Sequence, residues 1–243
     1  MAGHSRWAKV KNFKGGIDAK RGKIFAKLGK EISVAAKIGG GDPDMNPRLR
    51  MVLLRCRAAS MPNDNIERAI KKGTGAGEMV DFVDLTYEIY APHGVALLVE
   101  LSTDNRNRTA SEIRSLVTKA GGSIATANSV SRLFQRKGQI IVSRESANED
   151  QLMEVALEAG AEDFKAEEQG YEILTEPAHF EAVHKQIEAK GIKPVVAEIN
   201  SLPTLTVPLN AEQAVAVNKL IDALEENDDV KDVYSNAQFP GEV

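Results

Sequence analysis

The chain has 243 residues, of which 42% are apolar and 27% charged, with a formal net charge of −4. This composition excludes a disordered chain, and the length allows two or three domains. The single cysteine, Cys56, excludes an intrachain disulfide. No stretch approaches the roughly 20 apolar residues that span a bilayer, and the N-terminus lacks an apolar signal segment. We therefore expect a cytoplasmic protein without a membrane partner.

The net charge conceals two regions of opposite sign. Residues 1–75 hold 17 of the 31 Lys and Arg residues but only 6 of the 35 Asp and Glu residues. The rest of the chain is correspondingly acidic. A cationic segment joined to an acidic body is typical of a module that binds a polyanion, most often nucleic acid. The hypothesis is a positively charged grip, held apart from an acidic trunk that cannot bind the same ligand.

The basic region is predicted to begin with two helices. Apolar residues recur every three or four positions over 17–38, which predicts one helix, and the glycines at 39–41 end it. Asn46 followed by Pro47 predicts an N-cap and a first helical residue. The second helix should run to about residue 60.

A third helix and a linker should complete this region. The break at 61–62 precedes the helix, for which Asn63 or Asp64 is expected to supply the cap. Gly73 is expected just past its end. A flexible, glycine-rich linker is predicted at 73–77, where the charge balance changes sign.

Beyond the linker the pattern becomes mixed α and β. Strands are predicted from β-branched and apolar runs, and helices from apolar residues with a 3.6-residue period. The predicted strands cover 86–90, 95–101, 130–135, 139–143, 163–167, 171–174, 194–199, 205–207 and 230–235. The predicted helices cover 104–120, 148–159, 177–190 and 211–225, the last with a capping box of Asn210 and Gln213.

The order of these elements predicts an α+β multidomain fold: an N-terminal helical bundle followed by two ferredoxin-like α+β domains, the third inserted into the second. Residues 137–202 have the ferredoxin-like order β-α-β-β-α-β. One interpretation of the tail makes it the missing half of the sheet begun before the insertion. The predicted domains are 1–75, a discontinuous 80–136 plus 203–243, and the inserted 137–202.

Catalytic, cofactor and metal sites are not predicted. Cys56 has no CxxC partner, the histidines are scattered, and His184 falls on an apolar helix face where it should pack. The glycines at 73–77 precede no helix and do not resemble a phosphate-binding loop. Acidic pairs such as Asp228-Asp229 are expected to be solvated surface. An enzyme with a site between the two α+β domains stays open as an alternative.

The basic region is the main candidate site. Arginine planes and an indole can stack on bases, while Lys and Arg neutralise phosphates. Trp7 could equally anchor the N-terminal arm on the body. The candidate nucleic-acid-binding residues here are Arg6, Trp7, Lys9, Lys11, Lys14, Lys20, Arg21, Lys23, Lys27, Arg48, Arg50, Arg55, Arg57, Arg68, Lys71 and Lys72.

Arg106 and Arg108 form a second candidate, in the first turn of the helix predicted from residue 104. Free backbone N–H groups at a helix N-terminus favour an anion. The alternative is an ordinary N-cap with exposed polar residues.

Six segments stand in order along the chain: Met1-Ala-Gly-His-Ser-Arg-Trp-Ala-Lys, Asp18-Ala-Lys-Arg-Gly-Lys-Ile-Phe, Gly39-Gly-Gly-Asp-Pro-Asp, Asn46-Pro-Arg-Leu-Arg, Met61-Pro-Asn-Asp-Asn-Ile-Glu-Arg-Ala-Ile-Lys-Lys-Gly and Thr103-Asp-Asn-Arg-Asn-Arg-Thr. Together they closely resemble the YebC family, which includes the mitochondrial translational activator of cytochrome c oxidase. The resemblance spans the chain and is dense before residue 109. It implies a helical bundle and two α+β domains, the third inserted into the second. The arm departs from the family at Lys11-Asn12-Phe13-Lys14, where members commonly have Lys-His-Arg-Lys.

The resemblance implies a regulator of gene expression that grips nucleic acid without catalysis. Family members have been described as DNA-binding transcriptional regulators and as ribosome-associated translation factors that ease difficult stretches of synthesis. The arginine-rich second helix has no polar base-reading face, and an acidic body disfavours duplex DNA. We therefore expect a ribosome or rRNA partner, with DNA-binding transcriptional regulation as the alternative. The sequence does not give the oligomeric state, for which a monomer is favoured.

Overall fold

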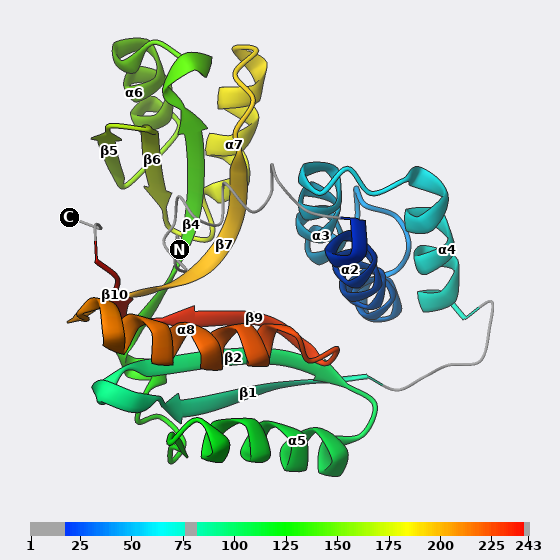
Figure 1. Ribbon diagram of the computed structural model, residues 1–243. Helices are drawn as coiled ribbons and strands as arrows, with labels where there is room; N and C mark the ends of the chain where they lie inside the picture. Colours follow the sequence, from blue (N-terminus) through cyan, green and yellow to red (C-terminus); the bar gives the residue numbers. More distant parts are fainter. Residues whose placement is uncertain (1–17, 76–81, 241–243) are drawn as a thin grey trace. The chain divides into compact units, whose positions relative to one another are not determined.

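The computed structural model describes residues 18–75 and 82–240, with the side chains of 18–21 left aside (Figure 1). The chain divides into two compact units, Met1–Phe134 with Pro203–Val243, and Gln135–Leu202. Helices come first and sheets follow, so the predicted α+β class is confirmed. No helix in the described residues is long and apolar enough to cross a membrane.

The helical head, which is the described part of residues 18–75, has three helices around its own apolar core. They are α2 (Asp18–Gly39), α3 (Pro47–Ala58) and α4 (Asn63–Gly73). The core forms because apolar side chains three and four positions apart share one helix face. Its buried members are Leu28, Ile32, Ala35, Leu49, Val52, Cys56, Met61 and Ala69.

Asn46 connects the end of α2 to the start of α3. Its side-chain oxygen accepts a hydrogen bond from the Leu49 backbone N–H at 3.0 Å, which confirms the predicted N-cap. Its amide donates to the carbonyls of Ala35 and Gly40, each at 2.8 Å. The predicted cap of α4 is wrong, because Pro62 occupies that position and no side chain caps the helix.

Gly73 serves packing rather than helix termination. The prediction placed it beyond α4, but it is the last helical residue, and Thr74 is the C-cap. A Cβ atom at Gly73 would lie 2.3 Å from the Ser33 carbonyl oxygen and 2.8 Å from the Ala36 Cβ. The Ser33 hydroxyl also donates to the Ala69 carbonyl at 2.9 Å. Small residues thus allow α4 to approach the backbone of α2.

The sheet domain, which comprises the described residues 82–134 and 203–240, contains a four-stranded sheet in the order β3-β1-β2-β9. β1 pairs with β2 and β3, and β2 with β9, all antiparallel. Figure 1 shows β1, β2 and β9 side by side. The C-terminal tail therefore returns to the sheet begun before the insertion. The strands are β1 (Val83–Tyr90), β2 (Ala96–Thr103), β3 (Ser123–Ile124) and β9 (Val230–Ser235).

Two helices pack on one face of this sheet, α5 (Arg106–Lys119) and α8 (Ala211–Glu225). Their apolar residues join those of β1, β2 and β9 in one buried cluster. The predicted capping box of α8 is confirmed, with Asn210 and Gln213 bonding each other's backbone N–H.

The other face of the sheet is covered by the segment that leads into β4 (Phe134–Ser143) and by the first residue of that strand. Val130 and Phe134 pack there against Leu98 and Tyr234. Glu88 fixes this segment, since its carboxylate accepts three backbone N–H bonds, from residues 128, 130 and 131. Burial alone would raise the pKa of Glu88, but these hydrogen bonds lower it.

Residues 135–202, called here the insert, carry a second four-stranded sheet in the order β5-β6-β4-β7. β6 pairs antiparallel with β4 and β5. The elements are β4 (Phe134–Ser143), α6 (Glu149–Glu158), β5 (Asp163–Glu167), β6 (Gly170–Thr175), α7 (Phe180–Ala189) and β7 (Val196–Pro203). On α7, His184 is buried and stacks on Phe180 with ring centroids 6.0 Å apart, so its predicted packing is confirmed.

Several predicted boundaries near the insert are wrong. The strands predicted at 130–135 and 139–143 are a short 3-10 turn, Ser131–Leu133, and one continuous strand, β4. The short strand predicted at 205–207 is β8 (Val207–Pro208), which pairs in parallel with β10 (Ala237–Gln238). β3 and β10 were not predicted, because two-residue strands carry no periodicity.

Gly73→Ala tests the close packing of α2 and α4. Alanine favours a helix, yet its Cβ would meet backbone that cannot move aside. We expect a loss of about 1–3 kcal/mol in the free energy of unfolding, measured by urea titration. Gly29→Ala is the control, because its Cβ meets nothing within 4 Å, and it should gain about 0.5–1 kcal/mol. Equal stability of Gly73→Ala and the wild type would contradict the packing argument.

Candidate nucleic-acid interface

Part of the predicted interface lies outside what the structure describes. The predictions for the N-terminal arm and the start of α2 therefore stay predictions. These residues are Arg6, Trp7, Lys9, Lys11, Lys14, Lys20 and Arg21.

Two cations of α2 bind the C-terminal end of α8 and the turn after it. The Lys27 ammonium donates to the Glu225 carbonyl at 2.6 Å. Lys30 donates to the Asp228 carbonyl at 3.1 Å and to the Asp229 carboxylate at 2.9 Å. The last carbonyls of a helix lack intrahelical partners and carry partial negative charge, so lysines are favourable there. Burial lowers the pKa of Lys27, although Glu225 and Asp228 act to raise it.

Two arginines of α3 bind aspartates of the sheet. Arg48 donates to Asp84 of β1 at 2.5 Å. Arg55 divides its guanidinium between Glu31 of α2 and Asp232 of β9, both at 2.9 Å. Burial raises the pKa of Glu31, and Arg55 opposes the shift. The hypothesis that the cationic grip is held apart from the acidic trunk is therefore wrong for these side chains.

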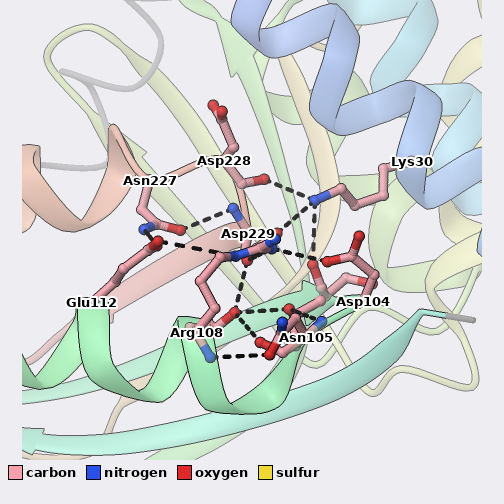
Figure 2. Close-up of polar contacts among 11 residues, drawn as sticks. Lys30, Asp104, Asn105, Arg108, Glu112, Asn227, Asp228 and Asp229 are labelled. Atoms are coloured by element: carbon pink, nitrogen blue, oxygen red, sulfur yellow. Dashed lines mark hydrogen bonds and ion pairs between the residues drawn. The ribbon is translucent and has the colours of Figure 1, made fainter.

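Asp229 is the centre of the largest of these contacts (Figure 2). Besides Lys30, its carboxylate accepts hydrogen bonds from Arg108 at 2.8 Å and from the Thr109 hydroxyl at 2.7 Å. The residue is only 5% exposed, so the prediction of solvated surface is wrong for it. Burial alone would raise its pKa, but the hydrogen bonds from Arg108, Lys30 and Thr109 lower it to about 2.

The second predicted candidate lies at the start of α5. Asn105 is the N-cap and accepts from the Arg108 backbone N–H at 3.1 Å. The Arg108 guanidinium binds Asp104 at 2.9 Å as well as Asp229 (Figure 2). Arg106 is exposed. In this arrangement Arg108 connects α5 to the turn before β9 rather than pointing away from the protein.

The other predicted cations of the helical head have a different environment. Arg50 donates to the carbonyls of Pro43 at 2.8 Å and Asp44 at 2.9 Å, which fixes the loop between α2 and α3. Arg68 bonds the Asp64 carbonyl and the Asn65 side chain within α4. The remaining four are exposed: Lys23, Arg57, Lys71 and Lys72.

The head thus carries two sets of cationic side chains. On α3, Arg48 and Arg55 lie on one border of the buried face and contact the sheet domain, whereas Arg50 and Arg57 lie on the other border. One set binds oxygens of the sheet domain and consists of Lys27, Lys30, Arg48 and Arg55. The exposed set is available to a ligand and consists of Lys23, Arg57, Lys71 and Lys72.

The sequence analysis did not identify Lys30 as a site residue, nor the three aspartates of the sheet domain that bind cations of the head. Lys30 follows Lys27 by three positions and so shares its helix face, a signal that could have included it. Asp84, Asp229 and Asp232 carried no signal, since their partners are far away in the sequence. No group of three or more His, Cys, Asp or Glu side chains within 18–75 and 82–240 could hold a metal ion.

Fold and charge together define a multidomain α+β protein whose cationic helical head is joined by ion pairs to an acidic sheet domain. Two family models match the chain: the TACO1/YebC protein N-terminal domain over residues 5–76, and the TACO1/YebC second and third domain over residues 82–237. The chain belongs to the TACO1/YebC family. The resemblance stated from its motifs is confirmed.

The similarity to proteins that carry a functional name extends over the whole length of the chain. A probable transcriptional regulatory protein of Desulforapulum autotrophicum is 51% identical over 243 residues, which are 100% of this chain and 98% of that protein. One from Rubrobacter xylanophilus is 50% identical over 244 residues, with the same shares. The crystal structure of a conserved hypothetical protein from Aquifex aeolicus has a TM-score of 0.82 and 46% identity, and the match covers 93% of each chain.

Asp229 should make stability depend on acidic pH. Its folded pKa of about 2 lies below the ordinary value of 3.8, so its ionised form stabilises the fold above about pH 4. That stabilisation should disappear as pH falls from about 4 to about 2. Asp229→Asn should be less stable than wild type at pH 7, and its stability should change less over this pH range. Urea titrations at several pH values measure this, with the exposed Glu226→Gln as control. Parallel wild-type and Asp229→Asn profiles would refute the assignment.

Proposed function

We propose that the protein is a non-enzymatic regulator of gene expression that binds nucleic acid through its helical head, with the ribosome and its rRNA as the favoured partner. One observation carries the proposal: the head concentrates the positive charge of an acidic chain and exposes Lys23, Arg57, Lys71 and Lys72. Such side chains neutralise phosphates irrespective of sequence.

The geometry of α3 supports recognition of backbone rather than bases. A recognition helix needs a row of free polar side chains that reach base edges in the major groove. On α3, Arg48 and Arg55 bind aspartates and Arg50 fixes a loop, which leaves Arg57 as its exposed arginine. A surface of this kind fits folded RNA, where phosphates are read by shape.

DNA-binding transcriptional regulation is the second candidate. It is favoured by the relatives from Desulforapulum and Rubrobacter, which are named probable transcriptional regulatory proteins. It predicts a preferred DNA sequence that survives competition with random DNA. A binding selection that returns such a sequence, together with no ribosome association, would replace the translation proposal.

The absence of catalysis belongs to the proposal as well. The alternative of an enzyme predicts a bound metabolite in purified protein or turnover of a small substrate. Native mass spectrometry of the purified chain addresses the first. A stoichiometric metabolite would overturn the non-enzymatic assignment.

Ribosome co-sedimentation tests the exposed cations. The triple variant Arg57→Glu, Lys71→Glu and Lys72→Glu should bind at least about tenfold more weakly than wild type at low salt. If three phosphate contacts are lost, the slope of log K against log salt should fall in magnitude by about 2 to 3. The reversal avoids Arg48, Arg50 and Arg55, whose protein contacts would confuse a folding defect with a binding defect.

The matched control reverses three exposed lysines of the insert, Lys185, Lys190 and Lys193, and so changes the net charge equally. It should sediment with ribosomes like the wild type. Equal losses in both variants would show that overall charge, rather than the head, governs association.

A further inference from the structure

The contact between the helical head and the sheet domain is made by charge. The head's apolar cluster and the large apolar cluster of the sheet domain have no residue in common. The contacts between the two parts run instead from Lys27, Lys30, Arg48 and Arg55 to carboxylate and carbonyl oxygens. Lys30 also lies over the Phe82 ring, 5.1 Å from its centroid. Each part therefore has an apolar core of its own.

Two ion pairs at this junction are only partly shielded from water, whereas the third, between Lys30 and Asp229, is more buried, with side chains 19% and 7% exposed. The Arg48 and Asp84 side chains are 40% and 38% exposed, and those of Arg55 and Asp232 are 25% and 20% exposed. Such pairs contribute little individually and weaken as salt screens them. For the same reason, a polyanion in solution can compete with these aspartates for the cationic side chains of the head.

The sheet-domain oxygens that bind the cations of the head resemble the phosphate oxygens of a nucleic-acid backbone in their chemistry. Guanidinium groups bind carboxylates and phosphates with the same planar fork, and ammonium groups bind either as a point charge. We define the acidic edge as Asp84, the Glu225 and Asp228 carbonyls, Asp229 and Asp232. Four cations of the head donate hydrogen bonds to the carboxylate and carbonyl oxygens of this edge.

We propose that the acidic edge is an internal competitor for nucleic acid. It occupies Lys27, Lys30, Arg48 and Arg55 in the free protein, and a nucleic-acid backbone displaces it and takes over these four side chains. The head then swings away from the sheet domain, and its cationic surface grows from the exposed set to both sets. This inference rests on the proposed function and adds to it a closed, self-inhibited state.

The acidic edge keeps partners after the head leaves, which makes the exchange feasible. Asp229 retains its hydrogen bonds from Arg108 and Thr109 (Figure 2). Asp84 retains Lys231, whose ammonium lies 3.6 Å from its carboxylate. On the head, Glu31 retains Arg55. Opening therefore leaves neither Asp229 nor Glu31, the most buried acids of the junction, without an opposite charge beside it, which would be the costly outcome. Asp232, whose side chain is 20% exposed, returns to water.

The first test measures the movement. Spin labels at Met45→Cys in the head and Ser115→Cys on α5 report the distance between the two parts; both positions are exposed. Cys56 should stay unlabelled, because it is buried and burial raises the pKa of its thiol to about 11. A short oligouridylate at saturation should shift the distance distribution, and high salt alone should broaden it. A control pair, Ser115→Cys with Val215→Cys, lies within the sheet domain and should not change.

The second test removes the competitor without touching the head. Asp84→Asn with Asp232→Asn keeps the shape of both side chains and should bind oligouridylate about five- to tenfold more tightly, since less of the protein is closed. It should also show the shifted distances before ligand is added. Glu154→Gln with Glu158→Gln, exposed on α6, makes the same charge change and should leave affinity near that of the wild type.

The outcomes separate this inference from the proposed function. Tight binding with unchanged head-to-sheet distances would overturn the competition while nucleic-acid binding stands. Equal gains in affinity from both double variants would also overturn it, because general repulsion would then explain the gain. No binding of oligouridylate or ribosomes by any variant would overturn both proposals together.

Discussion

The structure depends on how the cationic side chains of the helical head are paired with oxygen acceptors. The helical head gathers charges that repel one another, and a cation on a helix surface must be solvated, paired with protein or paired with a ligand. Lys27, Lys30, Arg48 and Arg55 are paired with the sheet domain, whereas Lys23, Arg57, Lys71 and Lys72 are exposed to solvent. This division assigns structural and binding tasks to residues that look alike in the sequence.

Asp229 shows how one acceptor can organise several elements. Its carboxylate receives donors from α2 and α5, while its backbone carbonyl accepts from Ser102 of β2 at 2.8 Å. A carboxylate with few donors would be costly at this depth, and three donors compensate for its burial. The same residue therefore serves the packing of the sheet domain and the attachment of the head, and only the second role is exchangeable.

Because the head joins the sheet domain through polar contacts, the strength of the junction depends on the solution. Apolar junctions are insensitive to salt and polyanions, whereas partly exposed ion pairs respond to both. The separate cores of the two parts make such a response compatible with a stable fold. Membership of the TACO1/YebC family is consistent with this modular construction, since its models also separate the N-terminal domain from the rest.

The sequence alone determined the helices, most strands and the charge division, because caps, breaks and periodicity are local. Asn46 and the Asn210–Gln213 box were predicted correctly for that reason, as was the packing of His184. Tertiary structure decided what local pattern cannot encode: that Gly73 is a contact point, that Asp229 is buried, and that four cations of the head meet aspartates or carbonyls more than 30 residues away. A charge in a sequence has a sign but no partner, and its partner is chosen only when distant segments fold together.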